Sequence, residues 1–148
     1  HASNNFGPFQ HREKLIPKIN FNALLGAEIP IYGDGAHTRD WLYVNDCVDA
    51  LLLAISQGIP GERYNIGAGN ERSNLELAQN ICEILDELRP RRGGRNYAEL
   101  IRFVVDRPGH EYRYAIDASK IRKLGWKPKS SFDDALRETI CWYLKKFA

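Results

Sequence analysis

Arg39 is the first residue whose side chain could hold a charged ligand. Its planar guanidinium is a fork of N–H donors that matches two oxygens of a diphosphate. The alternative is a surface ion pair with Asp34 or Asp40, which lie close by in the sequence. The residue types alone favour the ion pair, so anion binding at Arg39 needs support from a second feature.

The second candidate is the polar loop of residues 106–110, which reads Asp-Arg-Pro-Gly-His. Proline and glycine can hold a loop in a fixed bend. Such a bend could direct Arg107 and His110 toward one ligand, where they would contact a diphosphate and its nucleoside. The alternative for His110 is a partly exposed loop histidine without a function, which the residue types alone favour.

Catalytic and cofactor motifs are missing from the sequence. Residues 67–72 read Gly-Ala-Gly-Asn-Glu-Arg, which lacks the third glycine of a dinucleotide-binding turn, so an ordinary turn is favoured. Tyr143 is followed by Lys146, one residue too early for a Tyr-x-x-x-Lys pair. Zinc-protease, P-loop and Gly-x-Ser-x-Gly motifs do not occur. We therefore expect no catalytic group in this chain.

The cysteines indicate neither a disulfide framework nor a metal site. Cys47, Cys82 and Cys141 are odd in number and widely spaced, whereas both kinds of site need paired or clustered cysteines. We interpret them as small buried thiols in a reducing cytoplasm.

The composition is that of an ordinary globular protein. The chain has 148 residues, 27% charged and 43% hydrophobic, with a net charge of +2, so we expect one domain over residues 1–148 that binds neither nucleic acid nor membranes. The arginine-rich segment 89–95 lacks interleaved aromatic residues, which favours a solvated loop over a nucleic-acid site. Because Met is absent and the sequence begins at His1, we expect a piece of a longer polypeptide.

The hydrophobic pattern of the first half predicts two strands and two helices. Residues 13–25 form an apolar stripe that ends before Gly26, and 29–32 and 41–44 are typical of short strands. Asn45 is a good N-cap for a helix that ends at Gly58. Val48, Leu51, Leu52 and Ile55 are spaced as on one side of that helix.

The second half continues the alternation of strands and helices. Residues 63–66 and 100–105 are typical of strands, and Ser73 with Glu76 fits a capping box that opens a long helix. A short helix should follow Asp117, and a final helix should begin near Ser131. This pattern predicts an α/β fold with a small mixed sheet and several helices.

Short motifs of one known group of enzymes recur along nearly the whole chain. In sequence letters they are SNNFGP (3–8), EKLIP (13–17), PIYG (30–33), TRDWLYV (38–44), YNIG (64–67), NERSN (70–74), DRPGH (106–110), RYAID (113–117) and LGWKP (124–128). Together they resemble the C-terminal part of extended short-chain dehydrogenase/reductases, and KLIP and DRPGH are most similar to the dTDP-glucose 4,6-dehydratase family. Phe6 departs from the family pattern, which usually has Tyr there.

The resemblance implies a binding function for this chain within a lyase. In the family, an N-terminal Rossmann domain holds NAD, and the C-terminal part binds the dTDP-sugar. NAD accepts a hydride from C4 of the sugar, water is eliminated across C5 and C6, and the hydride returns to C6. The Tyr-x-x-x-Lys pair and the acidic groups that transfer protons precede the segment that matches this chain. The resemblance thus implies that the chain alone is inactive.

The resemblance also turns the ambiguous residues into a predicted substrate site. It favours the diphosphate interpretation of Arg39 and of the 106–110 loop, and it places Asn5 near the nicotinamide of NAD. The residues that it implies in substrate binding are Asn4, Lys14, Leu15, Pro30, Ile31, Tyr32, Arg39, Asn74, Asp106, Arg107, Pro108, Gly109 and His110. For each, an ordinary structural role stays the alternative: a solvated Lys14, a core Leu15, a half-buried Tyr32, or Asn74 in the first turn of a helix.

Two other functions remain open at this stage. One is the C-terminal part of another nucleotide-sugar epimerase or decarboxylase, and the other is a binding or assembly module without catalysis. In the family, the helix after Asn45 packs on the Rossmann sheet. Without that sheet, Leu51, Leu52 and Leu53 would be exposed, so we expect a homo-oligomer or a rearranged topology.

Overall fold

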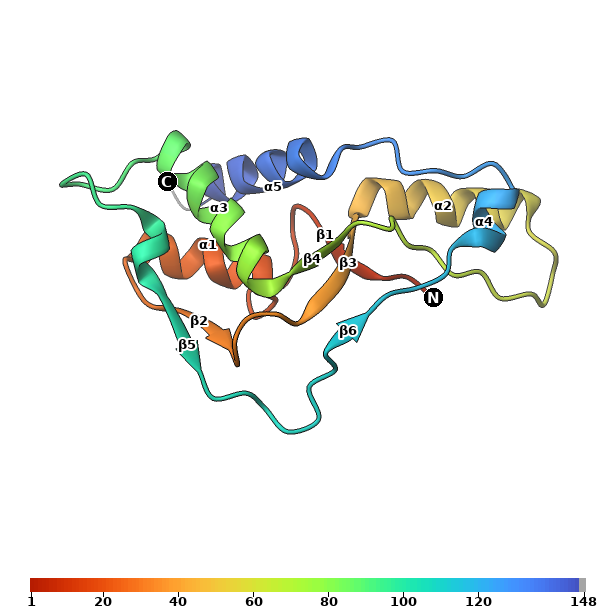
Figure 1. The fold of residues 1–148 in the computed structure, drawn as a ribbon. Helices are drawn as coiled ribbons and strands as arrows, with labels where there is room; N and C mark the ends of the chain where they lie inside the picture. The colour runs from red at the N-terminus through yellow and green to blue at the C-terminus, as the bar shows by residue number, and fades with distance from the viewer. Residues whose placement is uncertain (147–148) are drawn as a thin grey trace.

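Strand β3 (Thr38–Tyr43) is the centre of a four-stranded sheet in the computed structural model, which describes residues 1–146 (Figure 1). The C-terminal half of β3 pairs in parallel with β1 (Asn4–Phe6). Its N-terminal half pairs antiparallel with β4 (Glu71–Ser73) and parallel with β6 (Arg113–Tyr114). The predicted mixed sheet is confirmed.

A second, two-stranded sheet lies beside the first. It consists of β2 (Ile29–Tyr32) and β5 (Ile101–Val104), paired in parallel with Ile29 opposite Ile101. The short 3-10 helix Tyr97–Leu100 leads into β5. The segment between β5 and β6 passes from the small sheet to the larger one along the lower edge of the molecule in Figure 1.

Three helices pack together at one end of the molecule. α1 (Leu15–Leu25), α3 (Asn74–Leu88) and α5 (Phe132–Lys146) contact one another, and they bury the larger hydrophobic cluster (Figure 1). The Ser73 hydroxyl accepts a hydrogen bond from the Glu76 N–H at 3.1 Å, so the predicted start of α3 is confirmed. Such a cap satisfies one of the N–H groups that a helix leaves without a partner.

The other end is built around a smaller cluster. α2 (Val44–Gln57) and α4 (Ser119–Lys123) lie there with Leu42, Ile66 and Trp126. Asp46 of α2 connects this helix to the segment after α4, because its buried carboxylate accepts from the backbone N–H of Lys129 at 2.9 Å. Its backbone carbonyl also accepts from Nε1 of Trp126 at 3.1 Å.

Several element boundaries differ from the sequence prediction. The predicted strand 63–66 is wrong, because this segment forms only a single bridge between Ala2 and Ile66. α1 begins at Leu15 instead of residue 13, and α2 begins at Val44, which places Asn45 inside the helix. Strand β3 begins earlier than predicted, at Thr38, because β4 and β6 extend it by pairing.

The apolar stripe of α2 faces outward. The buried residues of the helix are Asp46, Cys47 and Ala50, and the stripe lies on the opposite side. Val48, Leu51 and Leu52 are exposed, and Ile55 is 81% exposed. The stripe agrees with the expectation that α2 leaves apolar surface uncovered. The expected exposure of Leu53 is wrong, because Leu53 is only partly exposed and packs against the smaller cluster.

Further sequence predictions concern membranes and cysteines. Among residues 1–146, no helix combines the length and the apolar character needed to cross a bilayer. The three cysteines are free thiols; Cys47 and Cys82 are buried as expected, and Cys141 is only partly buried. Residues 147 and 148, the end of the expected domain, lie outside the described part.

The cysteines should react with thiol reagents in the order of their exposure. Burial raises the pKa of Cys82 to about 12, and the charges of Asp86 and Glu83 add to the shift. Because the thiolate is the nucleophile, we expect Cys141 to react first and Cys82 to react only on unfolding. Mass spectrometry of reagent-treated protein, with Cys141→Ser as control, measures this order. Fast labelling of Cys82 in the folded protein would contradict it.

Candidate functional site: an anion-binding cavity

A cavity of about 360 Å³ lies where six segments of the chain meet. β1, the start of α1, β2, β3, the start of α3 and the loop between β5 and β6 each contribute to its wall. The lining residues are Asn4, Glu13, Lys14, Leu15, Lys18, Pro30, Tyr32, Arg39, Trp41, Asn74, Arg107 and His110. Most residues predicted from the sequence as substrate contacts are thus gathered around one space.

The charge of the cavity wall suits an anion. Lys14, Lys18, Arg39 and Arg107 contribute basic groups, against the single carboxylate of Glu13. Converging cations concentrate positive potential in a concave site, which attracts negatively charged ligands. A diphosphate, with several oxygens and a charge of at least −2, matches this wall.

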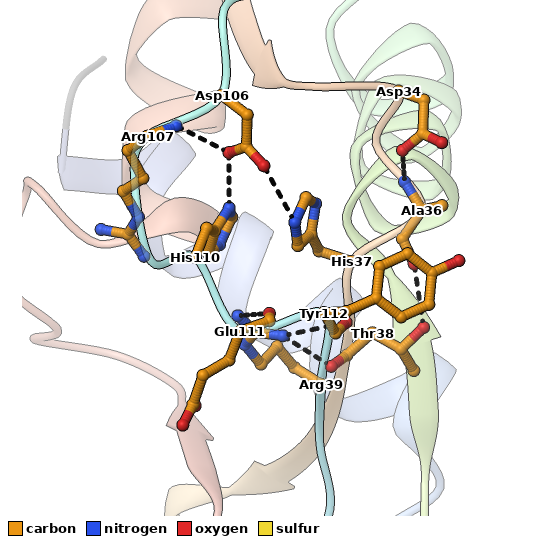
Figure 2. Close-up of polar contacts among 10 residues, drawn as sticks. All are labelled: Asp34, Ala36, His37, Thr38, Arg39, Asp106, Arg107, His110, Glu111 and Tyr112. Carbon is orange, nitrogen blue, oxygen red and sulfur yellow. Dashed lines mark hydrogen bonds and ion pairs between the residues drawn. The ribbon is translucent and has the colours of Figure 1, made fainter.

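Arg39 is held by the backbone of the loop that it faces (Figure 2). Its Nη2 donates to the carbonyl of Glu111 at 2.7 Å, and its Nη1 donates to the carbonyls of Thr38 at 2.8 Å and Tyr112 at 3.5 Å. A guanidinium has five N–H donors, so these bonds are compatible with a bound anion. The diphosphate clamp stays a prediction.

The ion-pair alternative for Arg39 is not what the structure has. Asp34 accepts from the backbone N–H of Ala36, and Asp40 is buried and accepts from the backbone N–H of Asn70. Burial lowers the pKa of Arg39; the Glu111 carboxylate opposes that shift and the charge of Arg107 adds to it. A bound anion would relieve both unfavourable effects.

Asp106 organises the loop of residues 106–110 (Figure 2). Its Oδ1 lies 2.7 Å from Nδ1 of His110 and accepts from the backbone N–H of Arg107 at 2.9 Å. Its Oδ2 lies 3.1 Å from Nε2 of His37. The hydrogen bond with His110 is the main cause that lowers the pKa of Asp106 below its usual value, and the N–H of Arg107 adds to the effect.

His37 was missed by the sequence analysis. It is buried next to Asp106, and its ring stacks on that of His110, with centroids 3.9 Å apart and planes at 15°. No local motif marks it, because Asp106 and His110 are 69 and 73 positions away in the chain. The residue type, a histidine just before the polar strand β3, was the only available signal.

Strand pairing fixes both ends of this loop. β5 pairs with β2 before the loop, and β6 pairs with β3 after it, where the N–H of Thr38 also donates to Tyr112 at 2.8 Å. Gly109 has φ 71°, the left-handed region that favours glycine, and it allows the turn in which His110 N–H donates to Arg107. Pro108 and Gly109 therefore shape the loop instead of lining the cavity.

The opposite part of the cavity is more apolar. Pro30 and Tyr32 line it from β2, and the ring of Tyr32 meets His110 edge to face at 6.3 Å. The side chain of Ile31 lies in the hydrophobic core, so only its backbone is available to a ligand. Asn4 and Asn74 add side-chain amide groups. The backbone N–H of Asn74 donates to the backbone carbonyl of His37, which holds Asn74 in place.

Two segments were considered for contact with NAD. Asn5 donates from its side-chain amide to the carbonyl of Ser3 at 3.0 Å, and its place near the nicotinamide stays a prediction. At Gly67 the space beside the backbone is filled, because even a methyl group would collide with Ile116 and Asp40. The segment after Gly67 enters β4 rather than a helix. Residues 67–72 therefore do not fit a dinucleotide-binding turn.

The chain matches a family model over most of its length. Residues 1–139 match the model described as GDP-mannose 4,6 dehydratase. The chain belongs to this family. The fold is accordingly that of the C-terminal part of extended short-chain dehydratases, as the sequence motifs implied.

Individual relatives narrow the resemblance. The chain is 53% identical to the dTDP-glucose 4,6-dehydratase of Neisseria gonorrhoeae over 146 residues, which are 97% of the chain and 42% of that protein. The dTDP-glucose 4,6-dehydratase of Bacillus anthracis, crystallised in complex with NAD, is 41% identical, with a TM-score of 0.84 over 97% of this chain and 43% of that one.

An epimerase shares the fold at lower identity. The UDP-glucose 4-epimerase of Thermotoga maritima, crystallised with UDP-glucose, is 29% identical, with a TM-score of 0.88 over the whole chain and 46% of that one. The chain spans about two fifths of the length of the dehydratases that it matches. The higher identity to the dehydratases agrees with the KLIP and DRPGH motifs and does not favour an epimerase.

Acid should weaken the loop contacts through Asp106. A carboxylate whose folded pKa is lowered stabilises the fold above its unfolded pKa, about 3.9, and this contribution is lost as the pH falls through the folded value. We expect the free energy of unfolding of the wild type to exceed that of Asp106→Asn at pH 5 and above, with the difference vanishing well below pH 4. Urea unfolding at a series of pH values measures it, and a difference independent of pH would contradict it.

Proposed function

We propose that this chain binds the nucleotide end of a dTDP-sugar within a dTDP-glucose 4,6-dehydratase-like lyase, which converts dTDP-glucose to dTDP-4-keto-6-deoxyglucose. The observation that carries the proposal is the cavity in which Lys14, Arg39, Arg107 and His110 converge beside Tyr32. Identity of 53% to a dehydratase supports the choice of nucleotide sugar.

The residues divide into two groups by chemistry. Arg39, Arg107 and Lys14 would neutralise the diphosphate, with His110 adding a directed ring nitrogen. Tyr32 and Pro30 would pack against the thymine base, whose apolar faces suit an aromatic ring. Asn4 and Asn74 can donate to or accept from polar groups of the nucleoside and the sugar.

The chemical steps would be supplied outside this chain. NAD, when bound in the whole enzyme, would supply hydride transfer; Asn5 would lie near its nicotinamide, but the turn at Gly67 does not fit its pyrophosphate. The cavity wall has cations and amides suited to binding. We therefore propose that the chain alone orients the nucleotide and forms no product.

We further propose that the chain folds as one domain over residues 1–148, in the cytoplasm. β3 supports the single domain, because its Trp41 belongs to the larger hydrophobic cluster and its neighbour Leu42 to the smaller one. The free thiols support a reducing compartment.

Nucleotide titration tests the proposed function. We expect isothermal titration calorimetry to detect binding of dTDP, weaker binding of UDP and no binding of NAD. Arg107→Ala should weaken dTDP binding about tenfold or more, because a charge-assisted hydrogen bond contributes about 1.5–3 kcal/mol. Arg92→Ala is the matched control, since Arg92 is exposed in the 89–95 loop, away from the cavity lining.

The possible outcomes separate the alternatives. Preference for UDP would indicate an epimerase-like site, and absence of any nucleotide binding would leave a structural role. Product formed from dTDP-glucose and NAD by the chain alone, detected by mass spectrometry, would contradict the proposed division of labour.

We also propose that the chain self-associates through the exposed face of α2. Leu52 is 59% exposed and Ile55 is 81% exposed, on the apolar stripe of the helix. Contiguous apolar surface of this kind favours association. In the whole enzyme, the same face would pack against the preceding domain.

Charge on this face should reduce association. We expect the double variant Leu52→Lys and Ile55→Lys to be monomeric at concentrations at which the wild type forms larger species in analytical ultracentrifugation. Leu25→Lys, which changes a residue 68% exposed at the end of α1, is the control and should behave as the wild type. A wild type that is monomeric with low binding of a hydrophobic dye would sink the idea.

A further inference from the structure

His37 occupies an unusual position beside the candidate site. Only 6% of it is exposed, and its ring lies between that of Tyr112, at 5.6 Å, and that of His110, at 3.9 Å. His110 lines the cavity, whereas His37 does not. Figure 2 shows both imidazoles turned toward the carboxylate of Asp106. His37 thus lies behind a ligand-facing residue and touches the same carboxylate.

The contacts with Asp106 determine where the ring protons lie. A nitrogen lone pair facing a carboxylate oxygen would be repelled, so Nε2 of His37 and Nδ1 of His110 each carry a proton toward Asp106. Nδ1 of His37 is buried without a hydrogen-bond partner. A second proton there would be a buried unsatisfied donor, which costs free energy. His37 therefore donates one hydrogen bond, from Nε2 to Asp106.

A metal ion is a poor alternative for this cluster. His37, Asp106 and His110 offer ligand atoms within 4.8 Å of one another. A metal, however, binds the lone pair in the plane of an imidazole, at about 2.1 Å. The two rings are stacked 3.9 Å apart with planes only 15° from parallel, so their lone pairs cannot converge on one ion.

We propose that His37 is a positioning residue for nucleotide binding: through Asp106 and ring stacking it holds His110 in the Nδ1–H form, with Nε2 directed away from Asp106 toward the ligand. The two nitrogens of an imidazole lie on opposite sides of the ring, so fixing one determines the direction of the other. This inference rests on the proposed function, since it assumes that the ligand of the cavity is a nucleotide.

Charged groups surround the two imidazoles. Asp106 is the anion that both rings face, and Arg39 of β3 and Arg107 of the loop line the same cavity as His110. Because Nδ1 of His110 faces Asp106, Nε2 is the ring nitrogen left for a ligand.

Two substitutions separate the proton donor from the ring. His37→Phe keeps an aromatic ring against Tyr112 and His110 but loses the donor, whereas His37→Gln places an amide N–H near the position of Nε2. We expect His37→Phe to weaken dTDP binding roughly threefold to tenfold in calorimetry, as for the loss of one hydrogen bond. His37→Gln should restore most of the affinity. His11→Phe, at an exposed histidine outside the cavity, is the matched control.

A spectroscopic measurement tests the same inference without nucleotide. Long-range ¹H–¹⁵N NMR distinguishes the two tautomers of an imidazole. We expect His110 to be Nδ1–H in the wild type and in His37→Gln, and a mixture of tautomers in His37→Phe. If His37→Phe fails to fold, His37→Asn replaces it, because its amide corresponds to Nδ1 and does not reach Asp106.

Each outcome bears on one proposal. An unchanged His110 tautomer in His37→Phe overturns the positioning role, as does a changed tautomer with unchanged dTDP affinity. Micromolar Zn²⁺ binding that is lost in His37→Phe would also overturn it, in favour of a metal site. If the wild type binds no dTDP, the proposed function fails, and the tautomer alone decides whether His37 positions His110.

Discussion

The pairing of β3 on both edges is the constraint on which the rest of the structure depends. β1, β4 and β6 all pair with this one strand. Side chains alternate along a strand, so Arg39 and Trp41 line the cavity while Asp40 and Leu42 face the other way. Asp40 is buried near Gly67, and Leu42 lies in the smaller cluster. A shift of β3 by one residue would exchange the two faces and remove both the cation and the aromatic ring from the cavity.

The cavity concentrates positive charge that its own protein only partly offsets. Burial lowers the pKa of Arg39, and the charge of Arg107 adds to that shift, so the arrangement of the two arginines is unfavourable by itself. The carbonyls of Glu111 and Tyr112 stabilise the guanidinium without neutralising it. A site preorganised in this way should bind an anion more tightly than a flexible site, because the free-energy cost of bringing the cations together is met during folding.

Local sequence patterns could predict those elements whose stability is local. β2 follows from a short apolar run with two isoleucines and a tyrosine, and the start of α3 follows from a Ser cap; both agree with the structure. Periodicity shows that a helix has an apolar face, but not which way it points. In α2, Leu42 of β3 and Trp126 share a cluster with Cys47 and Ala50, so Leu51, Leu52 and Ile55 face outward. His37 was beyond prediction for a similar reason, since its partners come from a loop that only the pairing of β6 brings near.

The loop that carries Arg107 and His110 depends on side chains more than on its own strand. β6 has two residues, Arg113 and Tyr114, and so few backbone bonds cannot order the eight-residue connection between β5 and β6. Side-chain contacts order the rest of the connection. Arg39 donates to the carbonyls of Glu111 and Tyr112, and Asp106 contacts both His110 and His37. Arg113 forms a bidentate pair with Glu71 of β4. All of these contacts involve charged or titratable groups. The order of the loop and the electrostatics of the cavity are therefore coupled, and a ligand that changes the charge of the cavity also changes how firmly the loop is held.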